Sequence, residues 1–200
     1  MKKLTALCMV AALVLALGTT LARAGETQQK LAQESMIEEV LKRGVLRVGM
    51  STFVPWAMKD KKGEIIGFEI DVAKELAKDM GVKVEFVPTA WDGIIPALLT
   101  GKFDVIIGGM SIRADRALKV NFSNPYDFSN QTICANKEKA KGFKTAADFN
   151  KPDVVVATRL GTSSTPAVKR LLPKAQLREF KDESALYQEV INGNVHAVVG

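Results

Sequence analysis

The chain has 200 residues, of which 47% are hydrophobic, 25% charged and 6% aromatic. This composition is that of an ordinary globular protein, and it excludes a disordered chain, a collagen-like chain and a multi-span membrane protein. The 28 Lys and Arg residues outnumber the 22 Asp and Glu residues and give a formal net charge of +6.

Residues 1–24 are typical of a secretory signal peptide. Lys2 and Lys3 precede an apolar run at 4–17 that only Thr5 interrupts, and residues 22–24 form a small-x-small cleavage site around Arg23. The run is too short to span a membrane. We therefore expect cleavage after residue 24, a periplasmic location, and a mature chain with 25 basic and 22 acidic residues, a net charge of +3. The remaining basic residues are dispersed, so nucleic acid is not an expected partner.

Cysteine and histidine are too few for several kinds of site. Cys8 leaves with the signal peptide, so Cys134 remains alone and no internal disulfide is possible. We expect Cys134 to be a small buried side chain in a strand. His196 is the only histidine, so any Ser-His-Asp or Cys-His site would have to use it, and a His-rich metal site cannot be built. No metal and no cofactor are expected.

Helical and strand patterns alternate along the rest of the chain. We expect helices at 37–43, 71–80 (capped by Asp71), 92–100, 145–149, 162–172 and 184–191, and strands at 45–50, 65–68, 82–87, 105–107, 130–136, 154–157, 176–180 and 195–199. Repeated strand–helix–strand units of this kind predict an α/β protein in which each of two lobes is a mostly parallel sheet flanked by helices.

The predicted domains follow from this order of elements. We expect a flexible leader at 25–36, a first lobe at 37–129, a hinge crossing strand at 130–136 and most of a second lobe at 137–200. The last strand ends at Gly200 with no covering helix. We therefore expect a chain truncated at its C-terminus, with a first lobe that lacks a returning segment.

Ligands of open α/β sheets bind beyond the carboxyl ends of the strands. Phe53 follows the first strand, Trp91 follows the strand at 82–87, and Gly108, Gly109, Ser111 and Arg116 follow the strand at 105–107. Glycines let backbone amides approach a ligand, and a hydroxyl and a guanidinium complete a receptor for a carboxylate.

The second lobe repeats this pattern. Gly161, Thr162 and Ser163 precede a helix whose Pro166 is acceptable only in its first turn, so the free amides of this turn can face the same cleft. Each feature also has a purely structural interpretation: the glycines as a turn, Thr162 or Ser163 as a helix cap, and Arg116 as a surface charge.

Two segments resemble the bacterial extracellular solute-binding proteins of family 3, the polar amino-acid receptors of ABC importers. The segment at 67–72 (GFEIDV) resembles the family's signature, and residues 111–126 resemble its carboxylate-binding stretch. The resemblance covers about residues 37–200 and implies a type II periplasmic-binding-protein fold that closes on its ligand by a hinge.

The resemblance also implies roles for particular residues. Arg116 matches the arginine that binds the α-carboxylate, with Ser111 and the Gly109 backbone beside it. Ser163, after Thr162, matches a second-lobe group on the same carboxylate, and Phe53 and Trp91 match residues that sandwich the ligand's side chain. The family's ammonium-binding aspartate is expected directly after Gly200.

The implied function is a monomeric, non-catalytic receptor that delivers a free amino acid to an ABC transporter permease. One alternative is a periplasmic cyclohexadienyl (arogenate or prephenate) dehydratase, which needs a proton donor near the leaving hydroxyl. No carboxylate stands just after Thr162, where such an enzyme is expected to have a glutamate, and this absence favours a receptor. The other alternative is the sensing module of a membrane receptor kinase or channel. Met50 stands where some relatives place a side-chain-binding acid, which argues against strong recognition of a cationic ligand tip.

Overall fold

The computed structural model describes residues 35–200, so the predicted signal peptide and nearly all of the predicted leader lie outside the described residues. Contacts divide the chain between Val45 and Leu46 into two units. In the first unit, helix α2 (Met36–Arg43) ends at Gly44, whose φ of 68° lies in the left-handed region that glycine adopts readily. This confirms the predicted helix.

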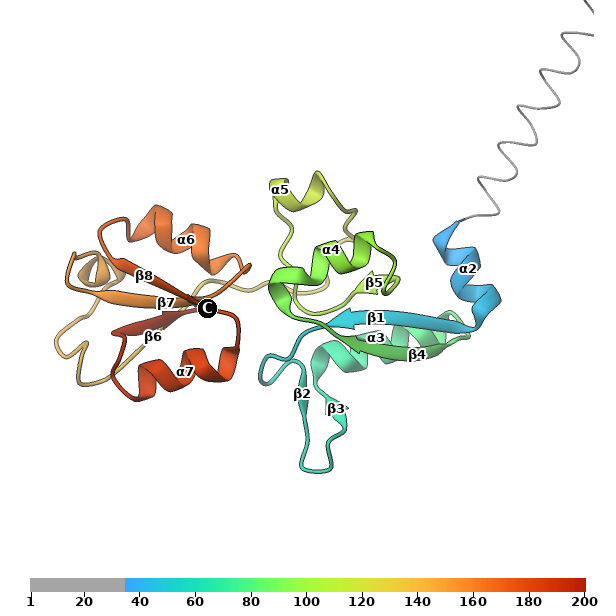
Figure 1. Ribbon diagram of the computed structural model, residues 1–200, viewed down its shortest axis with the longest axis horizontal. Helices are drawn as coiled ribbons and strands as arrows, with labels where there is room; N and C mark the ends of the chain where they lie inside the picture. The colour runs from blue at the N-terminus through green and yellow to red at the C-terminus, as the bar shows by residue number, and fades with distance from the viewer. Residues whose placement is uncertain (1–34) are drawn as a thin grey trace, which may run out of the picture. The chain divides into compact units, whose positions relative to one another are not determined.

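The first main sheet has the strand order β4-β1-β5. Strands β1 (Val45–Met50), β4 (Lys83–Pro88) and β5 (Val105–Ile106) confirm the predicted strands, and β1 and β5 are parallel. Helix α3 (Phe68–Asp79), the 3-10 helix η1 (Trp91–Gly93) and helices α4 (Ile94–Leu99) and α5 (Ala114–Ala117) belong to the same half of the chain. Helices α3 and α4 lie on opposite faces of this sheet (Figure 1). Ile70 of α3 packs in one apolar cluster with Met50, whereas Ile94 of α4 packs in another with Phe103.

The second main sheet has the order β6-β9-β7-β8. It consists of β6 (Ile133–Ala135), β7 (Val155–Arg159), β8 (Gln176–Phe180) and β9 (Ala197–Val199), with 3-10 helix η2 (Ala146–Phe149) and helices α6 (Ser164–Leu171) and α7 (Glu183–Ile191). Strand β7 pairs in parallel with both β8 and β9, and β6 pairs antiparallel with β9.

Alternation along β7 gives this sheet two buried faces. Val156 packs with Val168 of α6, and its neighbour Ala157 packs with Leu186 of α7. Successive strand side chains point to opposite faces, so the two helices cover opposite sides, as Figure 1 shows. Parallel sheets covered by helices confirm the predicted α/β class, whereas the predicted domain boundaries stay predictions.

The structure corrects the start of one predicted helix. Helix α3 begins at Phe68, so Asp71 lies inside it and is not its cap. Gly67 precedes the helix with a φ of 127°, and a Cβ there would collide with the Trp56 backbone, so the tight turn that starts the helix needs glycine. The strand expected at 65–68 covers only β3 (Ile65–Ile66), which pairs antiparallel with the unpredicted β2 (Met58–Lys59).

The expectation of a buried Cys134 is wrong. The residue lies in strand β6, as predicted, but its side chain is exposed. Strand β6 stands at the edge of its sheet with β9 as its one neighbour, so a side chain there has less of the sheet around it.

Residues 35–200 lack two further kinds of feature. No helix in this range is long and apolar enough to cross a membrane. The same residues contain no cluster of three or more His, Cys, Asp and Glu side chains that could hold a metal ion.

Candidate functional site

A pocket of about 210 Å³ lies where the loops that follow β1, β4, β5 and β7 meet. This volume is below the roughly 300–1,000 Å³ of pockets for drug-sized ligands, and so suits a smaller metabolite. All of the residues predicted to bind ligand line it: Phe53, Trp91, Gly109, Ser111, Arg116, Thr162 and Ser163. The structure therefore brings the whole predicted set together, while the role of each residue stays a prediction.

Arg116 is a buried cation at one end of this pocket. Its side chain lies on the short helix α5 and the residue is 5% exposed. Its Nη1 donates to the Ser111 carbonyl at 2.8 Å, and its Nη2 donates to the Gly161 carbonyl at 2.9 Å. The first acceptor belongs to the loop after β5 and the second, 45 residues beyond Arg116, to the loop after β7, so two distant segments fix the guanidinium.

Both acceptors of Arg116 are neutral. No salt bridge joins Arg116 to a carboxylate within the described part of the chain, and the nearby Asp115 pairs with Arg113 at 2.7 Å. Burial lowers the pKa of Arg116, and the charge of Arg113 lowers it further. The site thus holds a desolvated positive charge whose natural complement is an anion.

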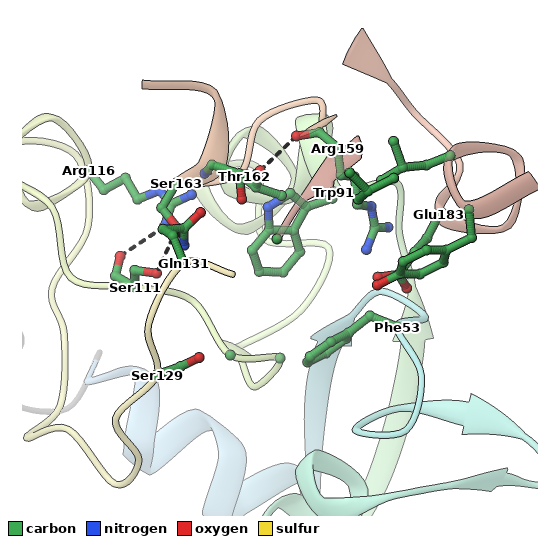
Figure 2. A pocket seen from close by; sticks show the side chains of 17 residues that line it. Phe53, Trp91, Ser111, Arg116, Ser129, Gln131, Arg159, Thr162, Ser163 and Glu183 are labelled. Carbon is green, nitrogen blue, oxygen red and sulfur yellow. Dashed lines mark hydrogen bonds between the residues drawn. The ribbon is translucent and has the colours of Figure 1, made fainter. Parts of the chain in front are cut away.

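Hydroxyl groups surround this charge. The Ser111 hydroxyl lies 3.4 Å from that of Ser163, which also accepts a hydrogen bond from the Gln131 amide at 3.2 Å. Ser163 stands at the start of α6 but makes no side-chain cap bond, so its hydroxyl faces the pocket instead of the helix end. Figure 2 shows Ser111, Gln131 and Ser163 gathered beside Arg116.

Thr162 has a local structural role. Its hydroxyl donates to the Arg159 carbonyl at 2.7 Å and lies 3.4 Å from the amide of Ser164. These contacts stabilise the turn between β7 and α6, and Pro166 lies in the first turn of that helix, as predicted.

Phe53 and Trp91 supply the apolar walls of the pocket. Trp91 is 8% exposed and lies in η1. Gly109 lets the loop after β5 approach Phe53, because its φ is 65° and a Cβ there would lie 3.2 Å from the Phe53 ring.

A buried carboxylate lies behind Gly109. Glu69 is 4% exposed, and the Tyr126 hydroxyl donates to its Oε2 at 2.6 Å. A Cβ on Gly109 would lie 3.4 Å from the other carboxylate oxygen. Burial raises the pKa of Glu69, and the hydrogen bonds from Tyr126 and the Gly109 backbone oppose this effect. Glu69 therefore supports the loop that carries Gly109, and the adjacent Asp71 is exposed on α3.

The sequence predictions missed Arg159 and Glu183, the charged residues at the other end of the pocket. Arg159 is the last residue of β7, so the rule that ligands bind beyond the carboxyl ends of strands, which predicted Thr162, also applies to Arg159. Glu183 starts α7, beyond the carboxyl end of β8. Burial raises the pKa of Glu183, whereas Arg159 and a hydrogen bond from the Val54 backbone lower it. A carboxylate from beyond helix α6 therefore lines the pocket.

Asp92 does not cap its helix. It lies within η1, no side-chain cap bond forms there, and its carboxylate lies 3.7 Å from the Lys181 ammonium. Gly93 takes the position before α4, so Asp92 is one residue too early to cap it.

Comparison with known proteins places the site in context. Residues 46–197 match the family model described as bacterial extracellular solute-binding proteins, family 3. The L-cystine-binding protein TcyJ of Escherichia coli is 31% identical over 177 residues, which is 88% of this chain and 66% of that protein. The cyclohexadienyl dehydratase of Pseudomonas aeruginosa is 30% identical over 164 residues, 81% of this chain and 61% of the enzyme.

A solved structure is also similar. The crystal structure of an ancestral amino acid-binding protein, described as a precursor of cyclohexadienyl dehydratase, is 52% identical with a TM-score of 0.80, and the match covers 83% of this chain and 74% of that one. The chain spans about two thirds or less of the length of the two curated relatives above.

The buried Glu69 makes stability depend on pH. Because its native pKa lies above the usual glutamate value of 4.5, the native state binds this proton more tightly than the unfolded state. The contribution of Glu69 to the free energy of unfolding is then fully present below pH 4.5, and this contribution is lost as the pH rises through the native pKa. Urea unfolding at several pH values above 4 should show the Glu69→Gln variant gaining stability relative to the wild type as the pH rises. The Tyr126→Phe variant should widen this pH window. A stability difference between Glu69→Gln and wild type that stays constant with pH would contradict this assignment.

Proposed function

Because the chain belongs to the bacterial extracellular solute-binding proteins, family 3, we propose that it is a non-catalytic receptor for a free amino acid. The ligand's α-carboxylate binds Arg116, and its side chain lies between Phe53 and Trp91. The observation that carries this proposal is the buried Arg116 guanidinium, which lines the pocket without a carboxylate partner among residues 35–200.

Several features make this end of the pocket fit a carboxylate. A guanidinium has five N–H donors, and Arg116 uses two of them on backbone carbonyls. The remaining donors and the hydroxyls of Ser111 and Ser163 can hydrogen-bond both oxygens of a carboxylate. Loss of water from the ligand anion is then offset by an ion pair in a partly desolvated site.

Binding is coupled to hinge closure in this proposal. The Arg116 guanidinium donates to the Gly161 carbonyl, and Arg113 donates to the Thr162 carbonyl at 3.2 Å. The Gln131 amide donates to the Ser163 hydroxyl. Residues of the predicted first lobe and of the predicted hinge therefore contact the start of α6 beside the proposed carboxylate position. A carboxylate bound by both sides favours the closed arrangement over an open one. The closed form of this monomer, exported to the periplasm by residues 1–24, then delivers the ligand to an ABC transporter permease.

A dehydratase is the second candidate, and one observation favours it. Glu183 lines the pocket and burial raises its pKa, as a proton donor requires. The positive charge of Arg159 and the hydrogen bond from the Val54 backbone oppose this rise without reversing it. Glu183 also lies at the opposite end of the pocket from Arg116 (Figure 2).

Arg116→Ala should weaken binding of the preferred amino acid by roughly 30- to 5,000-fold, or about 2–5 kcal/mol, the usual cost of removing one member of a buried charge pair. Calorimetric titration of the full-length protein with the twenty amino acids measures this loss. Lys119→Ala is the matched control, because Lys119 is an exposed cation just after α5 and should leave affinity unchanged. Normal binding by Arg116→Ala would show that the carboxylate binds elsewhere.

The full-length protein should not turn over prephenate or arogenate, because no carboxylate stands just after Thr162, where such an enzyme is expected to have its proton donor. Chromatographic product assays at pH 6 to 8 test this expectation. Turnover that Glu183→Gln abolishes, with amino-acid binding retained, would identify an enzyme instead of a receptor.

A further inference from the structure

The end of the pocket that faces away from Arg116 carries a second set of charges. In Figure 2, Arg116 and Ser163 lie on one side of Trp91, and Arg159 and Glu183 lie on the other. Among the pocket residues that the structure describes, the charged side chains are these two arginines and this one glutamate. A ligand held at Arg116 by its α-carboxylate therefore directs its side chain past Trp91 toward Arg159.

Arg159 has more hydrogen-bond donors than acceptors around it. Its Nη1 donates to the Thr52 carbonyl at 3.1 Å and its Nη2 donates to the Ser51 hydroxyl at 2.6 Å. Each of these nitrogens carries a second hydrogen. The Nε of Arg159 is buried with no hydrogen-bond partner.

The neighbouring tryptophan adds to this excess of donors. The guanidinium carbon of Arg159 lies 6.0 Å from the centre of the Trp91 ring. The Nε1 of Trp91 is also buried with no partner, and indole nitrogen is a donor only. Because these two nitrogens have almost no accessible surface, the donors that a ligand can reach are the second hydrogens on Nη1 and Nη2 of Arg159, and these are complementary to oxygen atoms.

Glu183 does not reverse this preference. Its carboxylate already faces the charge of Arg159 and accepts a hydrogen bond from the Val54 backbone. A cationic ligand tip placed here would be attracted by Glu183 and repelled by Arg159, which leaves little net gain for the loss of its water. An oxygen acceptor would instead meet unused N–H groups.

Building on the proposed function, we infer that Arg159 determines specificity at this end of the pocket, by selecting amino acids whose side chain ends in an oxygen acceptor over those that end in an ammonium or guanidinium group. An amide, a urea or a carboxylate supplies such an oxygen. Trp91 contributes to the same preference through its ring, which packs beside the Arg159 guanidinium.

Pairs of ligands matched in length test this inference in the wild-type, full-length protein. Citrulline and arginine differ only at the tip, where an oxygen replaces a charged nitrogen group, and glutamine and ornithine form a shorter pair. In the pair that binds more tightly overall, competition calorimetry should show the oxygen-bearing ligand binding about tenfold or more tightly than its cationic partner. This ratio is expected for a charge-assisted hydrogen bond.

Substitution of the arginine tests its part in the preference. Arg159→Leu should reduce the ratio of citrulline to arginine affinity by about tenfold or more, because Glu183 then faces a cationic tip without opposition. Arg178→Leu is the control, since Arg178 is exposed on the adjacent strand β8 and does not line the pocket. Thermal unfolding of both variants verifies that they fold. The wild-type comparison of ligand pairs tests the inference even if a variant fails to fold.

The outcomes separate this inference from the proposed function. Tightest binding of a cationic or purely apolar amino acid would overturn the specificity inference and leave the receptor proposal intact. An unchanged affinity ratio in a folded Arg159→Leu variant would also overturn it. Absence of binding to any amino acid would instead overturn the proposed function.

Discussion

The buried guanidinium of Arg116 is the constraint on which the pocket depends. A cation removed from water costs several kcal/mol unless other groups compensate it. The carbonyls of Ser111 and Gly161 orient this group and offset part of that cost, but they carry no charge. An anion that enters from the pocket supplies the missing partner and bonds groups on both sides of it at once. In the proposed receptor, affinity and closure thus have the same physical origin.

The two ends of the pocket have different tasks. Every amino acid has an α-carboxylate, so in the proposed receptor the end at Arg116 provides affinity without choosing among side chains. The walls formed by Phe53 and Trp91 accept many shapes, because apolar contact is not directional. Discrimination therefore falls to the far end, where Arg159 and Glu183 present charge and direction. A buried polar group left without its partner penalises the wrong ligand more strongly than a lost apolar contact does.

The sequence predicted those parts of the site that follow from strand ends. Arg116, Gly109 and Ser163 were found because parallel strands bring the loops at their carboxyl ends together. Arg159 and Glu183 were missed because an arginine at the end of a strand, or a glutamate in the first turn of a helix, is usually an ordinary surface residue. Their placement in the pocket depends on packing between distant segments, such as the bond from Arg159 to Ser51, which lie 108 residues apart.

A crystal structure of the full-length protein with its tightest-binding amino acid tests the central claim most directly. Both oxygens of the ligand's α-carboxylate should lie within hydrogen-bonding distance of the Arg116 guanidinium and the Ser163 hydroxyl. The claim is contradicted if that carboxylate binds elsewhere while Arg116 still contacts only the carbonyls of Ser111 and Gly161.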